Sequence, residues 1–547
     1  MKRLLGGLLT ICALNMPLEA SAQSNGCGTT SEDFKVLVKQ LEQNKDDFKR
    51  GLVAVRGPIT YVPINFWLVA KANGTGRVSE AKVLELLCAI NKKYLEMDIQ
   101  FYLANGNFFY LNNDVIYDTP AGTNGANFIS NEIYTRNNGA RHNALNIFLT
   151  NNANSESNVG VTVLGYYSNR SLNSEPAYYN DWVVIIKSQV SAARASTAEH
   201  EIGHFFSLLH PFYGWDNPVI YNPNGTVQLD YRTSQPCVSA AAPDGVNQTE
   251  RVSRGADKNC DVSGDRLCDT PADINLGLGW NANCTYNGAS KDPLCVGYDP
   301  DETNMMGYFD NCESTFSPLQ KAMVRADLLN NAKRAYLRPN LTPNIAAIAT
   351  LPTIIAPITG TTTTHSNFAR LDWSDVPGAT AYLVEVSKFN NFSADIAKRA
   401  VVFSSKFDLW EQTIAGFLIP GQSVSVYWRV TPFSNFQVCS APSIVGNFTT
   451  GTTVGVHEIE HVSNFTIAPN PVAAGQSMNI QLYTDESFNA QVKIYNVTGQ
   501  LLQNQAMNFE IGPNSRPLRI GNWGKGVYLL TIESDKGVLN KKIVLNE

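Results

Sequence analysis

The sequence contains few charged residues and no excess of positive charge. Only 16% of its 547 residues are Asp, Glu, Lys or Arg, whereas 44% are hydrophobic, so we expect a folded, globular chain. The formal net charge of -6 and the pI near 5.7 argue against a nucleic acid as the partner, because phosphate recognition needs clustered positive charge. The length of the chain predicts several domains.

Long apolar runs are missing, apart from a short one at the start of the chain. Lys2 and Arg3 precede the apolar stretch Leu4–Leu14, which is too short to span a bilayer, and Ala20–Ala22 offers a cleavage site. This pattern predicts a secretory signal peptide over residues 1–22. No later segment is long and apolar enough for a membrane helix, so we predict no transmembrane segment.

CxxC pairs, which are typical of zinc–thiolate sites, are also absent. Ten cysteines less Cys12 of the signal peptide leave nine, and six of these lie between Cys237 and Cys312. In an exported protein such clustering favours disulfide bonds. Because nine is an odd number, at least one thiol is left over.

Histidine is scarce, and its distribution is uneven. Three of the seven histidines fall in the single stretch His200–His210. In a helix, His200 and His204 leave the same face one turn apart, so both can bind one zinc ion. Glu201 lies beside that face and is suited to act as general base towards a metal-bound water. His210 can supply a third ligand if the helix ends and the chain turns back.

A second HExxH sequence occurs at His457–His461, and we reject it as a metal site. It follows a Thr/Gly stretch, has no apolar helical face, lacks a third ligand downstream and runs directly into a strand pattern. The stretch that begins at His200 has both the apolar face and the third histidine, so we place the chemistry there.

Three further motifs follow the histidine stretch in chain order. Gly264–Ala272 is an acidic loop that ends in Asp-Thr-Pro, Asn304–Tyr308 reads Asn-x-Met-x-Tyr, and Phe316–Gln320 opens the last predicted helix. Together with His200–His210 they resemble the pappalysin group of the metzincin zinc metallopeptidases. Ser207 departs from the pattern, because the family has glycine there, and a left-handed backbone would cost a non-glycine residue about 1–2 kcal/mol.

This resemblance implies an α+β metzincin-type catalytic domain, with a mixed sheet and an active-site helix, over residues 57–340. It implies a zinc endopeptidase in which the metal and a glutamate activate water. The implied site residues are the zinc ligands His200, His204 and His210, the base Glu201, the oxyanion-stabilising Tyr308, and Met306 as a structural residue beneath the metal.

Calcium and disulfide bonds are also implied by the resemblance. The candidate calcium ligands are Asp265, Asp269 and Thr270, the alternative for them being an ordinary solvated turn. The implied disulfides are Cys284 with Cys312, and Cys295 with either Cys260 or Cys268. The connectivity of the remaining cysteines stays open, since spacing alone does not settle it.

Residues 23–56 are polar and look like a removable pro-segment outside any core, cleaved near Arg50 or Arg56. Within this segment, Cys27-Gly28-Thr29 resembles the cysteine-switch segment of pappalysin proenzymes, in which a thiolate displaces the catalytic water from zinc. A disulfide is the alternative to such a switch, and the candidate partners of Cys27 are then Cys88 and Cys439.

Periodicity predicts the elements of the catalytic domain. The expected strands are residues 59–71, 99–103, 144–150, 160–167 and 181–187, and the expected helices are residues 79–97 and 318–337. We expect residues 105–139 to be loop-like. Residues 211–264 are either a substrate-facing insertion or a disulfide-tied surface loop, and we favour the second.

Two all-β sandwich domains are expected to follow. Short alternating strands over residues 353–452, with Trp373, Tyr382 and Trp428 as core aromatics, resemble a fibronectin type III domain, which we interpret as a spacer. Residues 463–547 resemble the C-terminal sorting domain of the type IX secretion system, the alternative being an adhesive sandwich. The motifs that carry this resemblance are Pro469–Pro471, Val492–Asn496, Gly526–Tyr528 and Lys541–Leu545.

These patterns predict a secreted zinc endopeptidase, exported through the periplasm to the cell surface or beyond. We expect protein or peptide substrates, the export machinery as a partner, and a monomer. One alternative is an inactive, zinc-stabilised surface adhesin, although Glu201 would then have no use. Another is a metallopeptidase with two histidine ligands and a downstream glutamate, in which His210 would not bind the metal.

Overall fold

The computed structural model divides into two compact units, Met1–Ile345 with Asn435–Cys439, and Ala346–Ser434 with Ser440–Glu547. The residues that the structure describes are 26–54, 56–136, 143–154, 163–169, 181–216, 219–221, 227–234, 237–278, 284–309, 311–339, 343, 346–393, 396–410, 417–454, 459, 461–534 and 536–546. The expected signal peptide, residues 1–22, lies outside them. Over these ranges, no helix has the length and apolar character needed to cross a membrane.

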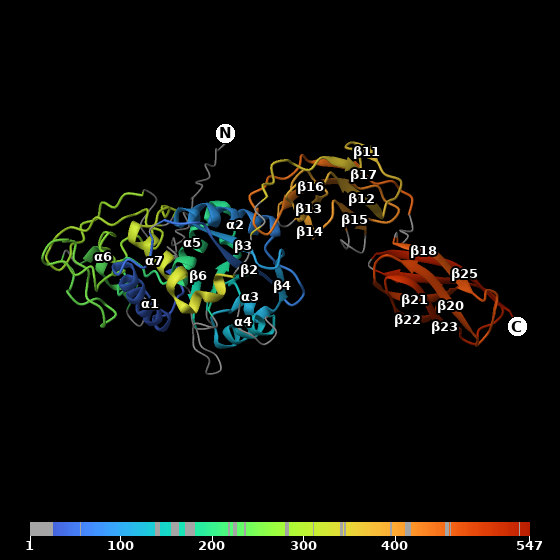
Figure 1. Ribbon diagram of the computed structural model, residues 1–547, viewed down its shortest axis with the longest axis horizontal. Helices are drawn as coiled ribbons and strands as arrows, with labels where there is room; N and C mark the ends of the chain where they lie inside the picture. The colour runs from blue at the N-terminus through green and yellow to red at the C-terminus, as the bar shows by residue number, and fades with distance from the viewer. Residues whose placement is uncertain are drawn as a thin grey trace, which may run out of the picture. The chain divides into compact units, whose positions relative to one another are not determined.

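A mixed, seven-stranded sheet forms the centre of the first unit (Figure 1). Its strands are β1 (Gly26–Cys27), β2 (Thr60–Ala70), β3 (Ile99–Leu103), β4 (Phe109–Asn112), β5 (Leu145–Thr150), β6 (Val163–Ser168) and β7 (Trp182–Ile186). Their order is β1-β6-β7-β5-β2-β3, and β4 also pairs with β2. Only the β6–β7 pair is antiparallel among these strands. The central strands are apolar runs because helices cover both faces of the sheet.

Helices lie on both faces of this sheet (Figure 1), as the mixed α+β prediction required. They are α2 (Glu80–Tyr94) and α5 (Ser196–Phe205) on one face, α3 (Asp114–Asp118) and α4 (Thr123–Arg136) on the other, and the short η1 (Leu95–Met97), η3 (Lys187–Gln189) and η4 (Ala192–Arg194). On the α3–α4 side, Trp67, Phe148 and Val184 form one row across three strands. This row packs with Ile116 and Ile129 of the two helices.

The prediction that residues 105–139 form a loop is wrong for its described part, which contains β4, α3 and α4. Asn113 caps α3, because its side-chain oxygen accepts a hydrogen bond from the backbone of Ile116 at 3.0 Å. In α4, Ile129 and Ile133 are buried at a spacing of one turn. Glycine and asparagine dominate the composition here and hide this apolar face.

The predicted closing helix is broken into α7 (Pro318–Asn330) and η5 (Ala332–Leu337). Ser317 and Gln320 form a capping box at the start of α7, and Pro318 occupies the first turn, where its missing N–H costs nothing. The break falls at Asn331, which has an extended backbone and caps η5 by accepting a hydrogen bond from Lys333.

The segment expected to remain outside any core is in fact built into one. Helix α1 (Ser31–Lys49) packs along α7 (Figure 1) and buries Phe34, Leu37 and Leu41, which are at most 4% exposed. Thr30 and Asp33 form a capping box at its start. The prediction was wrong because a mostly polar helix can bury a narrow apolar face, here at spacings of three and four residues.

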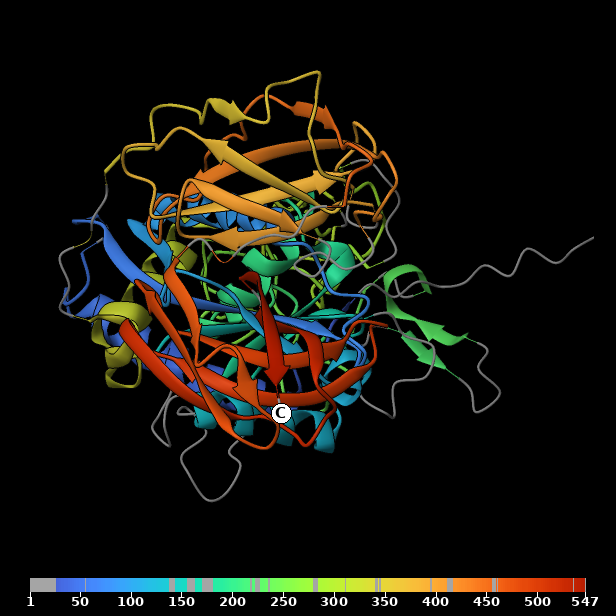
Figure 2. The same cartoon turned by 90° about the vertical axis from the view of Figure 1, so that its right-hand side faces the viewer.

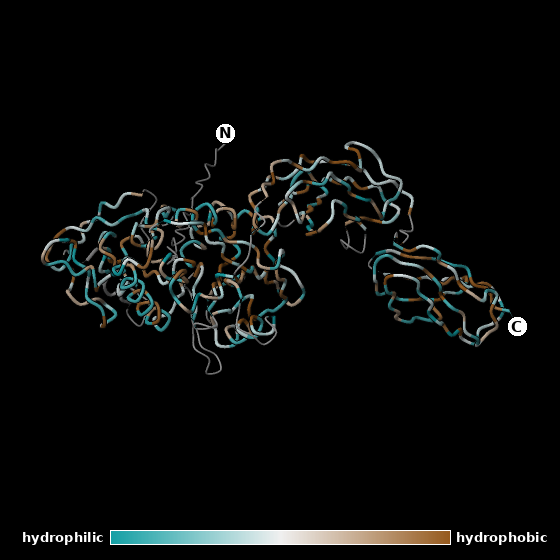
Figure 3. Tube along the Cα trace, in the orientation of Figure 1, coloured by the Kyte–Doolittle hydropathy of each residue, from teal (hydrophilic) through white to brown (hydrophobic). Residues whose placement is uncertain are grey.

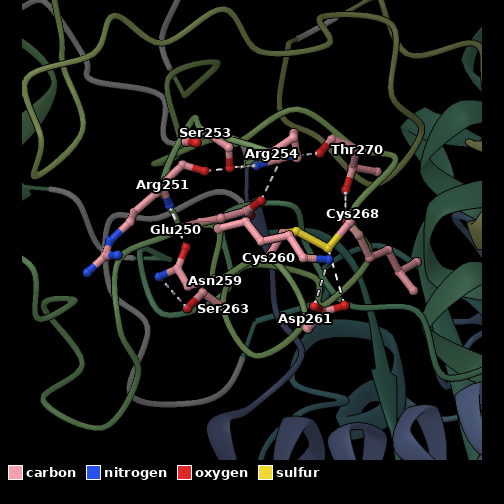
Figure 4. The surroundings of a disulfide bond; sticks show 12 residues. Glu250, Arg251, Ser253, Arg254, Asn259, Cys260, Asp261, Ser263, Cys268 and Thr270 are labelled. Atoms are coloured by element: carbon pink, nitrogen blue, oxygen red, sulfur yellow. Dashed lines mark hydrogen bonds and ion pairs between the residues drawn. A yellow bond between two sulfur atoms is a disulfide. The ribbon is translucent and has the colours of Figure 1, made fainter. Parts of the chain in front are cut away.

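Four disulfides join the described cysteines, and Cys27 carries a free thiol. The pairs are Cys88–Cys439, Cys237–Cys295, Cys260–Cys268 and Cys284–Cys312. The last pair is the one that the resemblance implied. The expected partner of Cys295 is wrong, because Cys260 and Cys268 lie on one tight turn and bond to each other (Figure 4). The alternative disulfide for Cys27 is also wrong, since Cys88 and Cys439 bond together.

Two disulfides, through Cys237 and Cys260, cross-link the described part of residues 211–264, as the favoured prediction expected. The elements described here are β8 (Val219–Tyr221), β9 (Val227–Asp230) and α6 (Tyr231–Ser234). A small core of its own, which includes Phe212, Trp215 and Val238, holds the loop against residues 272–309. Long irregular segments of this kind need such a core or cross-links to keep one conformation.

The first part of the second unit is a β-sandwich, as predicted. Its two sheets have the orders β10-β12-β15 and β11-β17-β16-β13-β14. The strands are β10 (Ile354–Ala356), β11 (Thr361–Thr362), β12 (Phe368–Trp373), β13 (Ala381–Ser387), β14 (Lys398–Val402), β15 (Lys406–Trp410), β16 (Ser425–Phe433) and β17 (Gly446–Thr449). Trp373, Tyr382 and Trp428 are all in its buried core, which confirms the three expected core aromatics.

A second sandwich, drawn in orange and red in Figure 2, follows. Its sheets have the orders β18-β20-β23 and β19-β25-β24-β21-β22. Its strands are β18 (Val462–Ala468), β19 (Val472–Ala473), β20 (Ser477–Thr484), β21 (Phe488–Asn496), β22 (Leu501–Phe509), β23 (Gly512–Arg519), β24 (Gly526–Ser534) and β25 (Gly537–Asn546). Exposed and buried residues alternate strictly along β20, and hydrophobic and hydrophilic residues interleave along the tube in Figure 3. The side chain of Asn470 holds β25 in place, because it donates to the carbonyl of Lys542 and accepts from the N–H of Val544.

Candidate metal centre and active site

Helix α5 carries the first two histidines and ends where the chain must turn towards the third. Ser207 has a left-handed backbone, with φ of 70°. The N–H of Ser207 donates to the carbonyl oxygen of His204 at 2.8 Å, and the N–H of Leu208 donates to the carbonyl oxygen of Gly203 at 3.0 Å. This pair of hydrogen bonds is the Schellman motif. Glycine normally occupies this position, so the serine is held there at a cost of about 1–2 kcal/mol.

The three histidine side chains point their Nε2 atoms at one place. His210 Nε2 lies 3.2 Å from that of His200 and 3.1 Å from that of His204. All three side chains are buried, with exposures of 7%, 0% and 1% for His200, His204 and His210. Three nitrogens at about 2.0–2.1 Å around a tetrahedral zinc ion lie about 3.3 Å apart, so this donor set fits the metal.

The other ring nitrogen of each histidine has an acceptor. His200 Nδ1 lies 2.9 Å from the carbonyl oxygen of Met305, and His204 Nδ1 lies 2.8 Å from that of Leu208. His210 Nδ1 lies 2.7 Å from a carboxylate oxygen of Asp216. These partners place the proton on Nδ1 and leave the Nε2 lone pair free for a metal. The sequence analysis missed Asp216, which no motif marked.

Burial controls the charge of the site. Burial, together with the nearby ring of His210, lowers the pKa of His200 to about 3. Burial also lowers the pKa of His204 well below its ordinary value. These imidazoles are therefore neutral, which is the form that binds metals. Burial also raises the pKa of Glu201 to about 8. Glu201 is 1% exposed and packs beside Gly165 of β6. A Cβ atom added at Gly165 would lie only 3.0 Å from the Cγ of Glu201.

Cys27 reaches the same place from strand β1. Its sulfur and the ring nitrogens of the three histidines all lie within 4.8 Å of one another. The sulfur also donates to Thr29 Oγ1 at 3.0 Å and lies 3.4 Å from Glu201 Oε2. The strand is held by parallel pairing of Cys27 with Gly165 on β6 and by the bond from the N–H of Gly28 to the carbonyl of Gly165, at 2.9 Å.

The residues expected at the methionine turn contact the active-site helix and the histidines. Met306 is fully buried under α5, where its sulfur lies 2.6 Å from the position that a side chain on Gly203 would take. Tyr308 Oη lies 3.4 Å from His210 Nε2 and accepts a hydrogen bond from the N–H of Cys27 at 2.9 Å. Met306 therefore contacts the helix backbone, while Tyr308 faces the histidines.

The three candidate calcium ligands are engaged in hydrogen bonds within the protein. Asp265 accepts from the N–H of Leu267 and from Thr270 Oγ1, each at 2.9 Å, and burial raises its pKa to about 7. Asp269 caps α7 by accepting from the N–H of Leu319 at 2.7 Å. In the described part of the chain, neither metal-competent cluster of side chains includes them, so calcium stays a prediction.

The rejected second motif has a different environment. His457, Glu458 and Glu460 lie outside the described residues. His461 is 43% exposed and lies 3.6 Å from Glu486, with which it can form an ion pair. Its surroundings are those of a surface residue of the last sandwich.

Comparisons with known proteins find similarity in two parts of the chain. Residues 466–546 match the protein-family model described as a secretion system C-terminal sorting domain. An extracellular metalloprotease of Colletotrichum graminicola is 28% identical over 224 residues, which are 38% of this chain and 72% of that protein. Over those residues this chain is similar to that metalloprotease. The sorting domain indicates export by the type IX secretion system to the cell surface or the extracellular space.

Two solved structures are similar at low scores. A mutant of Tannerella forsythia promirolysin is 16% identical, with a TM-score of 0.34, and the match covers 57% of this chain and 97% of that one. The fibronectin(III)-like modules of Clostridium thermocellum CbhA are 12% identical, with a TM-score of 0.14, over 36% of this chain and 93% of theirs. At these scores the similarity supports no argument about the fold, which the sheet topology given above defines.

Deleting residues 463–547 is expected to leave a folded peptidase that accumulates in the periplasm. The last sandwich has its own hydrophobic core, so its removal does not open the core of the first unit. Immunoblots of periplasm and culture medium, with intact chain as the control, measure the distribution. Undiminished appearance outside the cell would show that this domain is not the sorting signal.

Proposed function

We propose that this protein is a zinc endopeptidase of the pappalysin type, made as a latent precursor. The observation that carries the proposal is the convergence of three histidine Nε2 atoms, with that of His210 3.2 Å from His200 and 3.1 Å from His204, next to the buried carboxyl of Glu201. Cys27 completes a set of four candidate ligands in this form of the chain, but a purely structural zinc site would have no use for the adjacent base Glu201. Zinc, when bound, acts as a Lewis acid that lowers the pKa of water towards about 7 and polarises the scissile carbonyl.

Glu201 and Tyr308 supply the remaining chemistry. Glu201 accepts the proton of the attacking water and passes it to the leaving amine nitrogen. Tyr308, whose Oη lies 3.4 Å from His210 Nε2, donates its hydroxyl proton in a hydrogen bond to the carbonyl oxygen as negative charge develops. Burial keeps Tyr308 protonated, since it raises the pKa of this phenol well above its ordinary value.

The edge of the central sheet supplies a place for the substrate backbone. Strand β6 lies between β7 and β1, and β1 contributes only Gly26–Cys27. Without β1, the carbonyl of Gly165 and its neighbours would be an open strand edge directly beside Glu201. An extended peptide can add to such an edge through main-chain hydrogen bonds, which is how we expect a protein substrate to bind.

Latency follows from the position of Cys27. Its thiol lies where the three histidines converge, and β1 covers the edge that a substrate would need. A thiolate is a strong, soft zinc ligand that would fill the position required by water. We therefore propose that residues 23–56 are a pro-segment, and that cleavage near Arg50 or Arg56 allows it to leave.

A peptide-library digest is the direct test of this function. We expect the processed protein to cleave internal peptide bonds, and the Glu201→Ala variant to show no cleavage although metal analysis finds equal zinc in both. Mass spectrometry of the products gives the cleavage preference. Intact peptides with the processed wild-type protein, at full zinc content, would favour the alternative of an inactive, zinc-stabilised adhesin.

A further inference from the structure

Helix α1 contacts the catalytic unit at several places besides the thiol of Cys27. Its apolar face covers the back of the histidine cluster, where the ring of Phe34 lies 5.3 Å from that of His204 and 5.1 Å from that of His210. Leu37 and Leu41 continue this face and are fully buried. The strand that carries Cys27, in contrast, comprises only two residues.

A buried amide forms the most specific contact of this helix. Asn44 is 1% exposed, and its Nδ2 donates to Ser207 Oγ at 2.8 Å and to Asp327 Oδ1 at 3.2 Å. Ser207 is the left-handed residue that ends α5, and Asp327 also binds the buried Arg334 at 2.9 Å. The hydroxyl of Ser207 exists only because serine occupies a position that favours glycine. Asn44 therefore binds a hydroxyl that a glycine at this position would lack.

The end of the helix is held by a third part of the catalytic unit. Lys45 Nζ donates to the carbonyl of Asp261 at 2.9 Å, and Glu42 pairs with Arg266 at 3.2 Å. Both contacts fall on the turn closed by the Cys260–Cys268 disulfide (Figure 4). The disulfide limits the conformations of this turn, so the two contacts meet a preorganised surface.

We propose that Ser207, Asp327 and the turn 260–268 form a docking surface for α1 that binds it independently of the thiol. The occupant is the pro-segment itself, which this surface retains after cleavage and rebinds when released. Cutting near Arg50 or Arg56 therefore does not by itself free the site; dissociation of α1 is a separate step. This inference rests on the proposed function in taking residues 23–56 as a removable pro-segment.

The test is retention of the cut segment, which requires no peptidase activity. The full chain receives Glu201→Ala, to prevent self-digestion, and a site for a sequence-specific protease at Leu52, which is 52% exposed. After cutting, gel filtration shows whether the N-terminal fragment stays bound, and dilution of labelled protein gives its dissociation rate. We expect the fragment to be retained with Cys27→Ser as well as with Cys27.

Substitution of the amide should abolish this retention selectively. Asn44→Ala is expected to speed dissociation about tenfold or more, because it removes the donor to the buried hydroxyl of Ser207 and one of the donors to Asp327. Gln43→Ala is the matched control, since this amide is exposed and bonds only to Asp47 on the same helix. Ser207→Gly, which removes strain and should fold well, is expected to reduce the effect of Asn44→Ala.

Two outcomes would overturn the proposal. One is immediate release of the cut fragment from the Cys27→Ser chain, which would show that the thiol alone holds it. The other is equal dissociation rates for Asn44→Ala and Gln43→Ala, which would show that the amide is not a recognition contact. Failure of the processed wild-type protein to cleave peptides would count against the proposed function and leave these binding results intact.

Discussion

Replacing Glu201 with alanine is expected to leave zinc in place while lowering turnover about 10²–10⁴-fold or more, the loss typical of a missing general base. Glu201 lies beside the histidines, but its carboxyl is not needed to complete the set of three Nε2 atoms. Zinc content by mass spectrometry, together with kcat/KM on a peptide found in the library digest, separates the two effects. A Glu201→Ala protein that retained its turnover would contradict the assignment of the base.

The histidines should behave in the opposite way. His200→Ala, His204→Ala and His210→Ala are each expected to lose zinc and activity together, because each removes a ligand of a three-ligand site. His461→Ala is the matched control, since this histidine belongs to the second HExxH sequence and is 43% exposed. Full zinc content in His210→Ala would favour the alternative with two histidine ligands. Loss of zinc in His461→Ala would show that the metal binds at the second HExxH sequence instead.

Cys27→Ala is expected to make the precursor active before any N-terminal cleavage. The thiol is the group that lies among the three histidines, so its removal opens that position to water. Activity on small peptides, measured with uncut precursor, checks this result against uncut wild type. We expect only part of the processed enzyme's activity, because β1 remains paired with the sheet edge and α1 remains docked against Ser207.

The double variant Cys27→Ala/Asn44→Ala separates the effect of the thiol at the histidines from the effect of α1 docking. If docking of α1 limits access, the second change should raise the activity of uncut precursor further. A precursor that stays as inert as uncut wild type in both backgrounds would show that no cysteine switch exists. Gln43→Ala in place of Asn44→Ala controls for a general loosening of the helix.

Much of the candidate site was accessible from the sequence because its key spacing is local. His200, Glu201 and His204 share one helix, so a helical repeat is enough to place them together. The histidine partner Asp216 was missed, since nothing in its neighbours distinguishes it from any other loop aspartate. Gly165 was missed for a similar reason: its role is to leave room for Glu201, which is 36 positions away in sequence (201 minus 165).

The regular β-sandwiches were also predictable, because alternation along a strand is a two-residue pattern and survives in any single segment. Helices α3 and α4 were not, since their glycine- and asparagine-rich composition obscures the few residues that face the core. The partner of Cys295 could not be chosen from spacing, because pairing depends on which loops meet in space.

By itself, the sequence located the candidate metal chemistry at His200–His210 and marked Cys27 as a candidate switch residue, because short local motifs carry both. The tertiary structure alone decided between a free thiol beside the histidines and a disulfide for Cys27, and it alone placed helix α1 against the histidine rings. Cys27 meets the histidines across more than 170 positions, and Asn44 meets Ser207 across 163. Such contacts form only when the sheet and the disulfide-tied loops bring distant segments together, and no local pattern encodes them.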